Sequence, residues 1–359
     1  MAAENLRLLQ VIAGAPQGGA EAFFVRLTAG LAEAGVVSHA VLRPHAERRA
    51  VLQAAGVGIT ELPFGGLGDR MIGTTRRGLL RAIDDFRPTV VLSWMNRATR
   101  FLPAAPARPR PYVHVARLGG YYELKYYKHC DWLVGNTKDI VDYLVDNGWP
   151  PARARYLPNF ADETTSPAVS RASEGTPADV PLFLALGRLH VNKGFDVLLD
   201  AMARLPRAWL WLAGDGPLRA DLEAQAAKLG IADRVRFLGW RDDGPALMAA
   251  ADALVCPSRH EPLGNVVIEA WSRGLPVVAA RAQGPAALLD DGETGLLVPT
   301  EDSAALAVAL TRIAANRDLA DKIGAAGQGA YEEQFSKTAV VARYVDFLRE
   351  ITAENPPKA

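Results

Sequence analysis

"PLFLALGRLHVNKGFDVLLDAM", residues 181–202, joins an apolar run, a glycine-bounded loop and a helical pattern. The apolar run ends at Gly187, and a helix is predicted to start near Gly194. A second apolar run, "AWLWLAG", follows at residues 208–214. Strand, helix and strand in this order, with strands that are apolar throughout, are typical of a parallel sheet covered by helices on both faces. The stretch therefore predicts one unit of an α/β sheet.

The same alternation extends along the chain in both directions. Amphipathic segments such as "EAFFVRLTAGLAEAG" at 21–35 and "RADLEAQAAKLG" at 219–230 separate the apolar runs. The fold class is therefore predicted to be α/β, with two doubly wound, Rossmann-like domains. The predicted strands lie at 7–14, 38–43, 89–96, 111–117 and 131–137 in the first half, and at 181–187, 208–214, 234–239, 252–258, 275–280 and 294–299 in the second.

A polar stretch separates the two halves. Residues 161–181, "ADETTSPAVSRASEGTPADVP", have no apolar periodicity and are rich in Ser, Thr, Pro, Ala and charges, which is typical of an exposed connection. Near the end, "SKTAVVARYVDFLREI" has the pattern of an amphipathic helix. We expect an N-terminal domain at 1–165, a linker at 166–180, a C-terminal domain at 181–335, and a helical segment at 336–359 that packs back towards the N-terminal domain.

The composition limits the classes of function. The 359 residues are 49% hydrophobic and 22% charged, with a formal net charge of zero, which argues against a disordered chain and against general attraction to nucleic acid. The two cysteines, Cys130 and Cys256, have no CxxC spacing, so neither a disulfide framework nor a structural zinc site is expected. We find no signal peptide and no apolar run long enough to span a membrane. These features predict a cytoplasmic protein.

The loop that ends the opening strand carries two cations. Arg188 and Lys193 follow the strand within seven residues, and ligands of open parallel sheets bind beyond the carboxyl ends of the strands. A guanidinium fork and an ammonium point charge together suit a diphosphate. The alternative is that both are solvated surface cations.

The stretch "HEPLGNVVIEA", residues 260–270, offers a second anion site with two acids around it. A helix is predicted to begin near Gly264 or Asn265, and its first backbone N–H groups favour an anion. Glu261 would accept hydrogen bonds from sugar hydroxyls beside the phosphates, and Glu269, eight positions later, would bind the two vicinal hydroxyls of a ribose. The alternative is that Glu261 caps the helix or pairs with Arg259, and that Glu269 is a surface acid.

The first half contains weaker candidates. Trp94 and Asn96 follow one strand and Arg117 ends another, so they are candidates for contacting a second substrate. His114 lies in the strand "PYVHVAR", where a buried core histidine is the alternative. The segment "GGYYELKYYKHC", residues 119–130, which includes Tyr121, interleaves tyrosines with lysines. It is either a surface for anionic lipid or a helix with tyrosines against the core.

Three further features remain. The Gly18–Gly19 pair after the first strand permits close approach of a ligand, and a tight turn explains it equally well. Gly214, in "AGDGPLR", belongs to an incomplete dinucleotide fingerprint. Trp240, in "FLGW", would place backbone groups against a nucleobase. No stretch has metal-ligand spacing, a nucleophile elbow or a P-loop.

Taken together, "GGAE", "GRLHVNKGFD", "AGDGPLR", "FLGW", "CPSRHEPLGNVVIEAWSRGLPVVAA" and "GETGLLVP" resemble the retaining glycosyltransferases of family 4. The resemblance covers nearly the whole chain and is strongest from Leu182 to Pro299. It implies the GT-B fold, with two Rossmann-like domains facing each other across a cleft. It also implies an acceptor in the N-terminal domain and a nucleotide-diphosphate-sugar donor, of UDP or GDP type, in the C-terminal domain, with no cofactor and no metal.

The resemblance assigns roles residue by residue. Arg188 and Lys193 match the diphosphate-binding pair; Glu261 and Glu269 match the two acids that face the donor sugar and the ribose. His114 loosely matches a histidine near the transferred sugar, which completes a catalytic set of Glu261, Lys193, Arg188 and His114. The resemblance also implies donor contacts at Gly18, Gly19, Gly264 and Asn265. From their own places in the sequence, the predicted donor site further includes Gly214, Trp240 and Leu263, and the candidates for acceptor binding are Trp94, Asn96, Arg117 and Tyr121.

The predicted function is transfer of a sugar to a glycan or glycolipid acceptor in bacterial envelope biosynthesis, lipopolysaccharide or a related polymer. The place of action would be the cytoplasm, with peripheral contact at the inner face of the cytoplasmic membrane. A nucleotide-sugar 2-epimerase of the same fold is the main alternative. A nicotinamide oxidoreductase is more distant because no complete G-x-G-x-x-G is followed by an acid about 20 residues later. A non-catalytic partner subunit is the third alternative.

Overall fold

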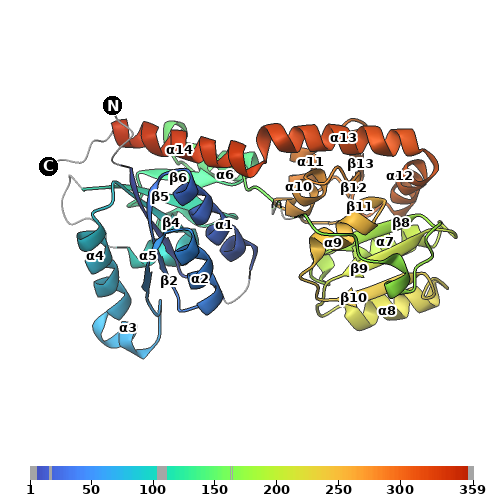
Figure 1. Ribbon diagram of the computed structural model, residues 1–359, viewed down its shortest axis with the longest axis horizontal. Helices are drawn as coiled ribbons and strands as arrows, with labels where there is room; N and C mark the ends of the chain where they lie inside the picture. The colour runs from blue at the N-terminus through green and yellow to red at the C-terminus, as the bar shows by residue number, and fades with distance from the viewer. Residues whose placement is uncertain (1–5, 16–17, 103–110, 162, 164, 355–359) are drawn as a thin grey trace. The chain divides into compact units, whose positions relative to one another are not determined.

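The computed structural model describes residues 6–354 except 16–17, 103–110, 162 and 164. The chain forms two compact units. Unit 1 comprises Met1–Asn159 together with Lys337–Ala359, and unit 2 comprises Phe160–Ser336. Each unit is an α/β sandwich around one parallel sheet (Figure 1). The predicted two-domain α/β class is therefore confirmed.

The sheet of unit 1 has seven parallel strands among the described residues, in the order β3-β2-β1-β4-β5-β6-β7. Strand β1 lies in the middle and pairs with both β2 and β4. The order reverses direction between β1 and β4, which is the doubly wound pattern. The strands are β1 Arg7–Ile12, β2 Val37–Leu42, β3 Gly58–Glu61, β4 Val90–Trp94, β5 Val113–Leu118, β6 Trp132–Gly135 and β7 Ala154–Tyr156.

Helices connect these strands and cover the sheet of unit 1 (Figure 1). The last helix of the chain, α14, packs against α1 and so belongs to this unit. The helices are α1 Gly19–Glu33, α2 Ala46–Ala54, α3 Leu67–Ile72, α4 Thr74–Phe86, α5 Met95–Phe101, α6 Lys138–Asp146 and α14 Lys337–Glu354, with short 3-10 helices η1 Leu124–Tyr126 and η2 Pro151–Arg153.

The sheet of unit 2 has six parallel strands among the described residues, in the order β10-β9-β8-β11-β12-β13. Its strands are β8 Leu182–Leu186, β9 Trp209–Ala213, β10 Val235–Gly239, β11 Ala253–Cys256, β12 Val277–Ala280 and β13 Leu296–Val298. Its helices are α7 Phe195–Met202, α8 Arg219–Lys228, α9 Gly244–Ala250, α10 Asn265–Trp271, α11 Gln283–Leu288, α12 Ser303–Ala315 and α13 Arg317–Gln334, with 3-10 helices η3 Arg171–Glu174 and η4 Val191–Lys193.

The position of β8 inside its sheet explains why the strand is apolar at every residue. Phe183 and Ala185 pack into one hydrophobic cluster, and Leu182 and Leu184 pack into another. Successive side chains of a strand point to opposite faces of the sheet, so both faces of this sheet are covered. Because β8 is buried on both sides, each of its positions is apolar, and this is what the sequence pattern predicted.

The stretch predicted as a linker, 166–180, is instead a packed part of unit 2. Arg171 in η3 donates hydrogen bonds to Ala250 O and to Asp252 Oδ1, both at 2.9 Å. Thr176 is buried and accepts a hydrogen bond from Trp211 Nε1 at 2.9 Å. These contacts are hydrogen bonds of polar side chains. Because hydrogen bonds of this kind need no apolar face, the sequence of the stretch shows no apolar periodicity. The chain passes between the units after Asn159 and after Ser336.

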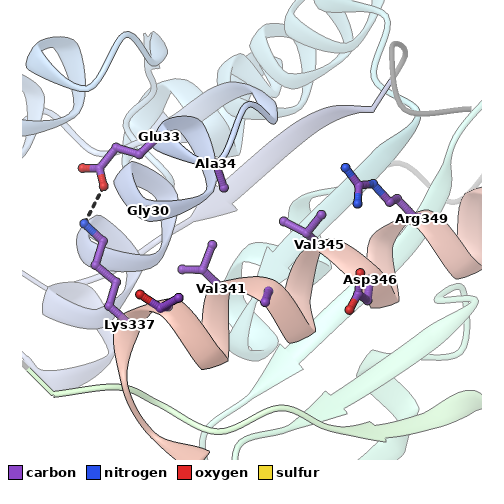
Figure 2. A pocket seen from close by; sticks show the side chains of 10 residues that line it. Gly30, Glu33, Ala34, Lys337, Val341, Val345, Asp346 and Arg349 are labelled. Carbon is purple, nitrogen blue, oxygen red and sulfur yellow. Dashed lines mark hydrogen bonds and ion pairs between the residues drawn. The ribbon is translucent and has the colours of Figure 1, made fainter. Parts of the chain in front are cut away.

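Helices α1 and α14 enclose a groove of about 520 Å³ in unit 1 (Figure 2). Its floor is made of small apolar residues, and an ion pair between Lys337 Nζ and Glu33 Oε2, 2.5 Å apart, lies at one end (Figure 2). Asp346 and Arg349 lie along α14 further from that pair (Figure 2). The groove contains none of the residues predicted to bind a substrate.

Candidate active site

The two loops predicted to hold a diphosphate are neighbours in unit 2. Strands β8 and β11 pair in parallel, with Leu184 opposite Leu254. The carboxyl ends of neighbouring parallel strands lie at one edge of a sheet. The loop after β8, residues 187–194, and the loop after β11, residues 257–264, therefore meet at that edge.

Lys193 and Glu261 form an ion pair between these loops. Lys193 is the last residue of η4, and its Nζ donates a hydrogen bond to Glu261 Oε2. The two side chains are only 25% and 11% exposed. The Lys193 stem passes Gly187, where an added Cβ would lie 3.3 Å from Lys193 Cε. The structure thus brings together two of the predicted site residues and holds the ammonium at a defined place.

The turn that carries Glu261 is fixed from two directions. Glu261 Oε1 accepts a hydrogen bond from Gly264 N at 3.4 Å, and Glu261 O accepts one from Gly284 N at 2.7 Å. A Cβ at Gly284 would lie 2.7 Å from Glu261 O, so only glycine allows this approach. Gly264 is the residue before α10, and no described side chain caps the first N–H groups of that helix. The alternative that Glu261 caps the helix is therefore not supported.

The alternative that Glu261 pairs with Arg259 is wrong. Arg259 pairs with Asp196 and Glu301, and Lys193 takes the place beside Glu261. Arg188, the second predicted cation, follows Gly187 directly and is exposed at the same sheet edge.

Cys256 lies beneath the ion pair at the end of β11. Its thiol is fully enclosed, and burial together with the negative charge of Glu261 raises its pKa to about 11. The thiol is therefore protonated and unreactive at neutral pH.

Helix α10 begins at Asn265, as predicted, and Gly264 precedes it with a left-handed φ of 69°. A Cβ at Gly264 would lie 3.1 Å from Leu288 in α11, so the glycine serves both conformation and packing. Leu263, Asn265 and Glu269 are half-buried, whereas the helix buries its apolar residues in the core.

Three neighbouring strands of unit 2 end in glycine at this edge. Gly187, Gly214 and Gly239 follow or end β8, β9 and β10, and Gly214 N donates to Gly239 O at 2.7 Å. A Cβ at Gly214 would lie 1.9 Å from Gly187 O. Close packing of the strand ends therefore explains the glycine at 214 by itself. Donor binding by Gly214 stays a prediction. Trp240 comes next and is 72% exposed.

The Gly18–Gly19 turn of unit 1 encloses a buried acid that the sequence analysis did not single out. Glu21 Oε1 accepts a hydrogen bond from Ala15 N at 2.8 Å. A Cβ at Gly18 would lie 2.2 Å from Glu21 Oε2, and one at Gly14 would lie 2.5 Å from Glu21 Cγ. The glycines make room for this carboxylate, which also accepts the Ala15 N–H. The "GGAE" motif was the available signal.

The assignment of His114 to the catalytic set is corrected. His114 is the second residue of β5 and lies near its amino end, away from the edge where ligands bind. Its buried Nε2 lies 3.0 Å from Ser93 Oγ and 3.9 Å from Cys130 Sγ. The alternative of a satisfied core histidine is the one that the structure supports.

Two of the acceptor-binding assignments are corrected for the same reason. Trp94 is fully buried, and its Nε1 donates to Gln10 Oε1 at 3.1 Å. Arg117 is buried and donates to Tyr344 Oη at 2.9 Å and to Asn159 Oδ1. Its guanidinium also stacks on the Trp94 ring, with Cζ 4.6 Å from the centroid. Both side chains hold unit 1 together and present no surface to a second substrate.

The remaining acceptor candidates stay accessible. Asn96 is half-buried in the first turn of α5, and Tyr121 is exposed, with its hydroxyl donating to Asp139. The tyrosine-lysine stretch 119–130 forms the short 3-10 helix η1 and turns rather than a longer helix. Tyr127 is fully buried in a cluster with Leu133, which favours the core alternative over a lipid surface.

Within the described ranges, no three His, Cys, Asp or Glu side chains form a group that could hold a metal ion. The described helices include none that is both long and apolar enough to cross a membrane.

Comparisons with known proteins agree with this architecture. The family model described as "Glycosyltransferase Family 4" matches residues 17–165, and the model "Glycosyl transferases group 1" matches residues 180–316. Lipopolysaccharide core biosynthesis glycosyltransferase LpsE of Rhizobium meliloti is 38% identical, covering 92% of this chain and 96% of the relative. LpsD of the same organism is 36% identical, covering 92% and 95%.

Solved structures show the same fold. Sucrose-phosphate synthase from Thermosynechococcus elongatus superposes with a TM-score of 0.80 at 22% identity, covering 98% of this chain and 100% of that one. Anabaena Alr3699/HepE in complex with UDP gives 0.81 at 20% identity, covering 96% and 100%. The two-domain fold, the matched family models and the relatives that align along nearly their whole length place this chain in the group 1 glycosyltransferases of family 4, with the GT-B fold.

Proposed function

We propose that this glycosyltransferase moves a sugar, with retention of anomeric configuration, from a nucleotide-diphosphate-sugar to an acceptor in the core of lipopolysaccharide. The observation that carries the proposal is the Lys193–Glu261 pair, held beside Gly264 where β8 and β11 end. The names of the relatives LpsE and LpsD support the choice of acceptor, and the UDP bound by Anabaena HepE supports a UDP-sugar as the first donor to test.

The chemistry requires positive charge at the leaving group. When the bond between the anomeric carbon and the diphosphate breaks, negative charge develops on the phosphate oxygens. Lys193 and Arg188 stand at the edge of the sheet where those oxygens would bind, and fixed donors of this kind stabilise such charge without reorganising. Removing one of them is expected to raise the barrier by roughly 3–4 kcal/mol.

The ion pair gives Lys193 and Glu261 complementary roles. In the absence of donor, Glu261 compensates the lysine charge. A bound diphosphate competes for the ammonium and leaves Glu261 free to accept hydrogen bonds from hydroxyls of the donor sugar. Retention then follows a front-face route in which the leaving phosphate accepts the proton of the attacking hydroxyl, so no covalent glycosyl-Glu261 is needed. Glu269 would bind the ribose from α10.

The charge distribution of the chain supports acceptor binding by unit 1. Unit 1 has 24 lysines and arginines against 16 aspartates and glutamates, which leaves a formal net charge of +8, and unit 2 has 16 against 24, which leaves −8. A positive unit suits the phosphates of an anionic glycolipid and of the membrane surface that contains it.

The corner of α3 and α4 is the surface that we propose for peripheral membrane contact, in place of the tyrosine-lysine stretch. Met71 and Ile72 are 78% and 58% exposed there, and Arg76 and Arg77 on the next turn are exposed as well. Apolar side chains beside cations suit an anionic bilayer surface. We expect binding to phosphatidylglycerol vesicles that weakens with salt and with the Met71→Ser/Ile72→Ser double substitution. The exposed Val308 of unit 2, changed to Ser, is the control.

The central experiment is a thermal-shift panel of nucleotide-sugars, followed by a transfer assay with truncated lipopolysaccharide. A donor at 100 times its dissociation constant stabilises the protein by about 2.7 kcal/mol. Product NMR reports the anomeric configuration. Consumption of donor without any acceptor would instead indicate the epimerase, which none of the relatives described above supports by name. Because the proposed charge stabilisation comes from side chains, activity should survive EDTA; a strict requirement for a divalent metal would contradict it.

A further inference from the structure

Arg259 and Asp196 connect the two loops of the proposed donor site. Asp196 lies in the first turn of α7, three residues after Lys193, and Arg259 lies two residues before Glu261. The guanidinium forms a two-pronged contact: Nη1 is 2.7 Å from Asp196 Oδ1 and Nη2 is 2.6 Å from Asp196 Oδ2. A bidentate arrangement fixes orientation as well as distance.

The same arginine is tied to the backbone that precedes Lys193. Arg259 Nη1 donates to Val191 O at 3.0 Å. The backbone N–H groups of Arg259 and His260 both donate to Asn192 O, at 2.9 and 3.1 Å. Every residue of η4 before Lys193 is therefore hydrogen-bonded to the loop that carries Glu261.

We propose that Arg259 and Asp196 are positioning residues for the transfer reaction, which hold Lys193 opposite Glu261 so that the ammonium meets the leaving diphosphate. This inference rests on the proposed donor site. It concerns a pair to which neither the resemblance nor the relatives assign a role.

Arg259 does not itself act as a phosphate ligand in this arrangement. Its Nε donates to Glu301 at 2.6 Å, and Nη1 and Nη2 are engaged by Asp196 and Val191. The hydrogen bonds from Arg259 also keep the pKa of Asp196 below its ordinary 3.8, so the carboxylate is ionised at neutral pH.

The need for such a pair follows from the flexibility of lysine. Lys193 has a four-carbon stem, and the place of its ammonium depends on the backbone of η4. An error of about 1 Å in the position of a catalytic group can cost about 10²-fold in rate. The contacts of Arg259 fix the backbone of η4 and so limit where the Lys193 ammonium can lie. The carboxylate of Glu261 is a single flexible partner and would not fix that position alone.

A double-mutant cycle on the full chain tests the proposal. UDP affinity is measured by calorimetry for the wild type, Arg259→Ala, Lys193→Ala and the double variant, with GDP in its place if the nucleotide-sugar panel selects it. We expect Arg259→Ala alone to weaken UDP about tenfold or more, the scale of one charge-assisted contact. Added to Lys193→Ala it should cause no further loss, because it acts through Lys193.

Two variants separate positioning from general damage to the fold. Asp196→Asn, which preserves shape, should raise the donor KM and lower kcat as Arg259→Ala does, while the acceptor KM stays unchanged. Arg317→Ala removes an exposed ion pair of the same unit, with Asp321, and should change neither. Additive losses in the cycle, or wild-type UDP affinity in Arg259→Ala, would overturn the positioning role of Arg259 and Asp196. Failure of the wild-type chain to bind either nucleotide would instead overturn the proposed donor site, and the positioning role with it.

Discussion

The two units place their polar residues differently with respect to their sheets. In unit 2 the polar residues that the sequence singled out follow the strands, and Lys193 and Glu261 meet at the carboxyl edge. In unit 1, His114, Trp94 and Arg117 lie within strands, and all three are buried. A polar side chain inside a strand that is covered on both faces joins the core, whereas one just beyond the strand end remains available to a ligand. Position relative to the strand end, more than residue type, separates site from scaffold.

The largest effect should come from the pair at the edge of unit 2. Lys193→Ala and Glu261→Gln are each expected to lower the transfer rate by roughly 10²–10³-fold, since each removes a preorganised polar contact. Circular dichroism and the unfolding transition should stay close to wild type. Lys228→Ala, which removes an exposed lysine at the end of α8, is the control. Undiminished turnover in both site variants would show that polar residues at the strand ends of unit 2 are no more important for activity than the buried ones of unit 1.

A backbone change beside Lys193 should come next. Gly194 has φ of 63°, and an added Cβ would lie 2.2 Å from Pro257 O, so Gly194→Ala combines conformational strain with a clash between the two loops. Gly230 has φ of 68° and open space around it, so Gly230→Ala carries the strain alone, about 1–2 kcal/mol. We expect activity to be lost only at Gly194, and the difference in unfolding free energy between the two variants to measure the clash. Equal behaviour of both would show that the loops tolerate separation.

In unit 1 the same kind of experiment should report on stability instead of substrate affinity. Arg117→Met removes the buried guanidinium that donates to the Tyr344 hydroxyl and to the Asn159 amide oxygen. We expect the free energy of unfolding of unit 1, measured by urea titration, to fall by about 2–3 kcal/mol. The acceptor KM should be unchanged. A raised acceptor KM with normal stability would restore the acceptor role that the sequence suggested for Arg117.

The smallest effect concerns acid. Because Arg259 holds the pKa of Asp196 below 3.8 in the folded state, the ion pair contributes its stability above that pH and loses it as pH falls through the lowered value. Both side chains are partly exposed, so the contribution is below about 1 kcal/mol. The stability difference between wild type and Asp196→Asn should therefore shrink below pH 4 and stay constant between pH 5 and 8. A difference that grows towards low pH would contradict the assigned direction.

The sequence predicted the sheets, the start of α10 and the loops after β8 and β11, because apolar runs and glycine-bounded turns leave local patterns. It did not predict the Arg259–Asp196 contact or the buried Glu21. The Arg259–Asp196 contact joins ordinary charged residues that stand 63 positions apart, and nothing in the local pattern marks it. Glu21 accepts a hydrogen bond from Ala15 N within its own turn, and the "GGAE" motif was its only local signal. The packed stretch 166–180 was missed for a related reason, since it is held by hydrogen bonds at Arg171 and Thr176 instead of an apolar face.

The cysteines of the chain fall one in each unit, Cys130 in unit 1 and Cys256 in unit 2, and both thiols are shielded. A thiol-reactive dye should therefore label neither in the native protein and each as its own unit opens. Peptide mapping of the labelled positions along a urea gradient would then yield a separate opening curve for each half, without any engineered cysteine.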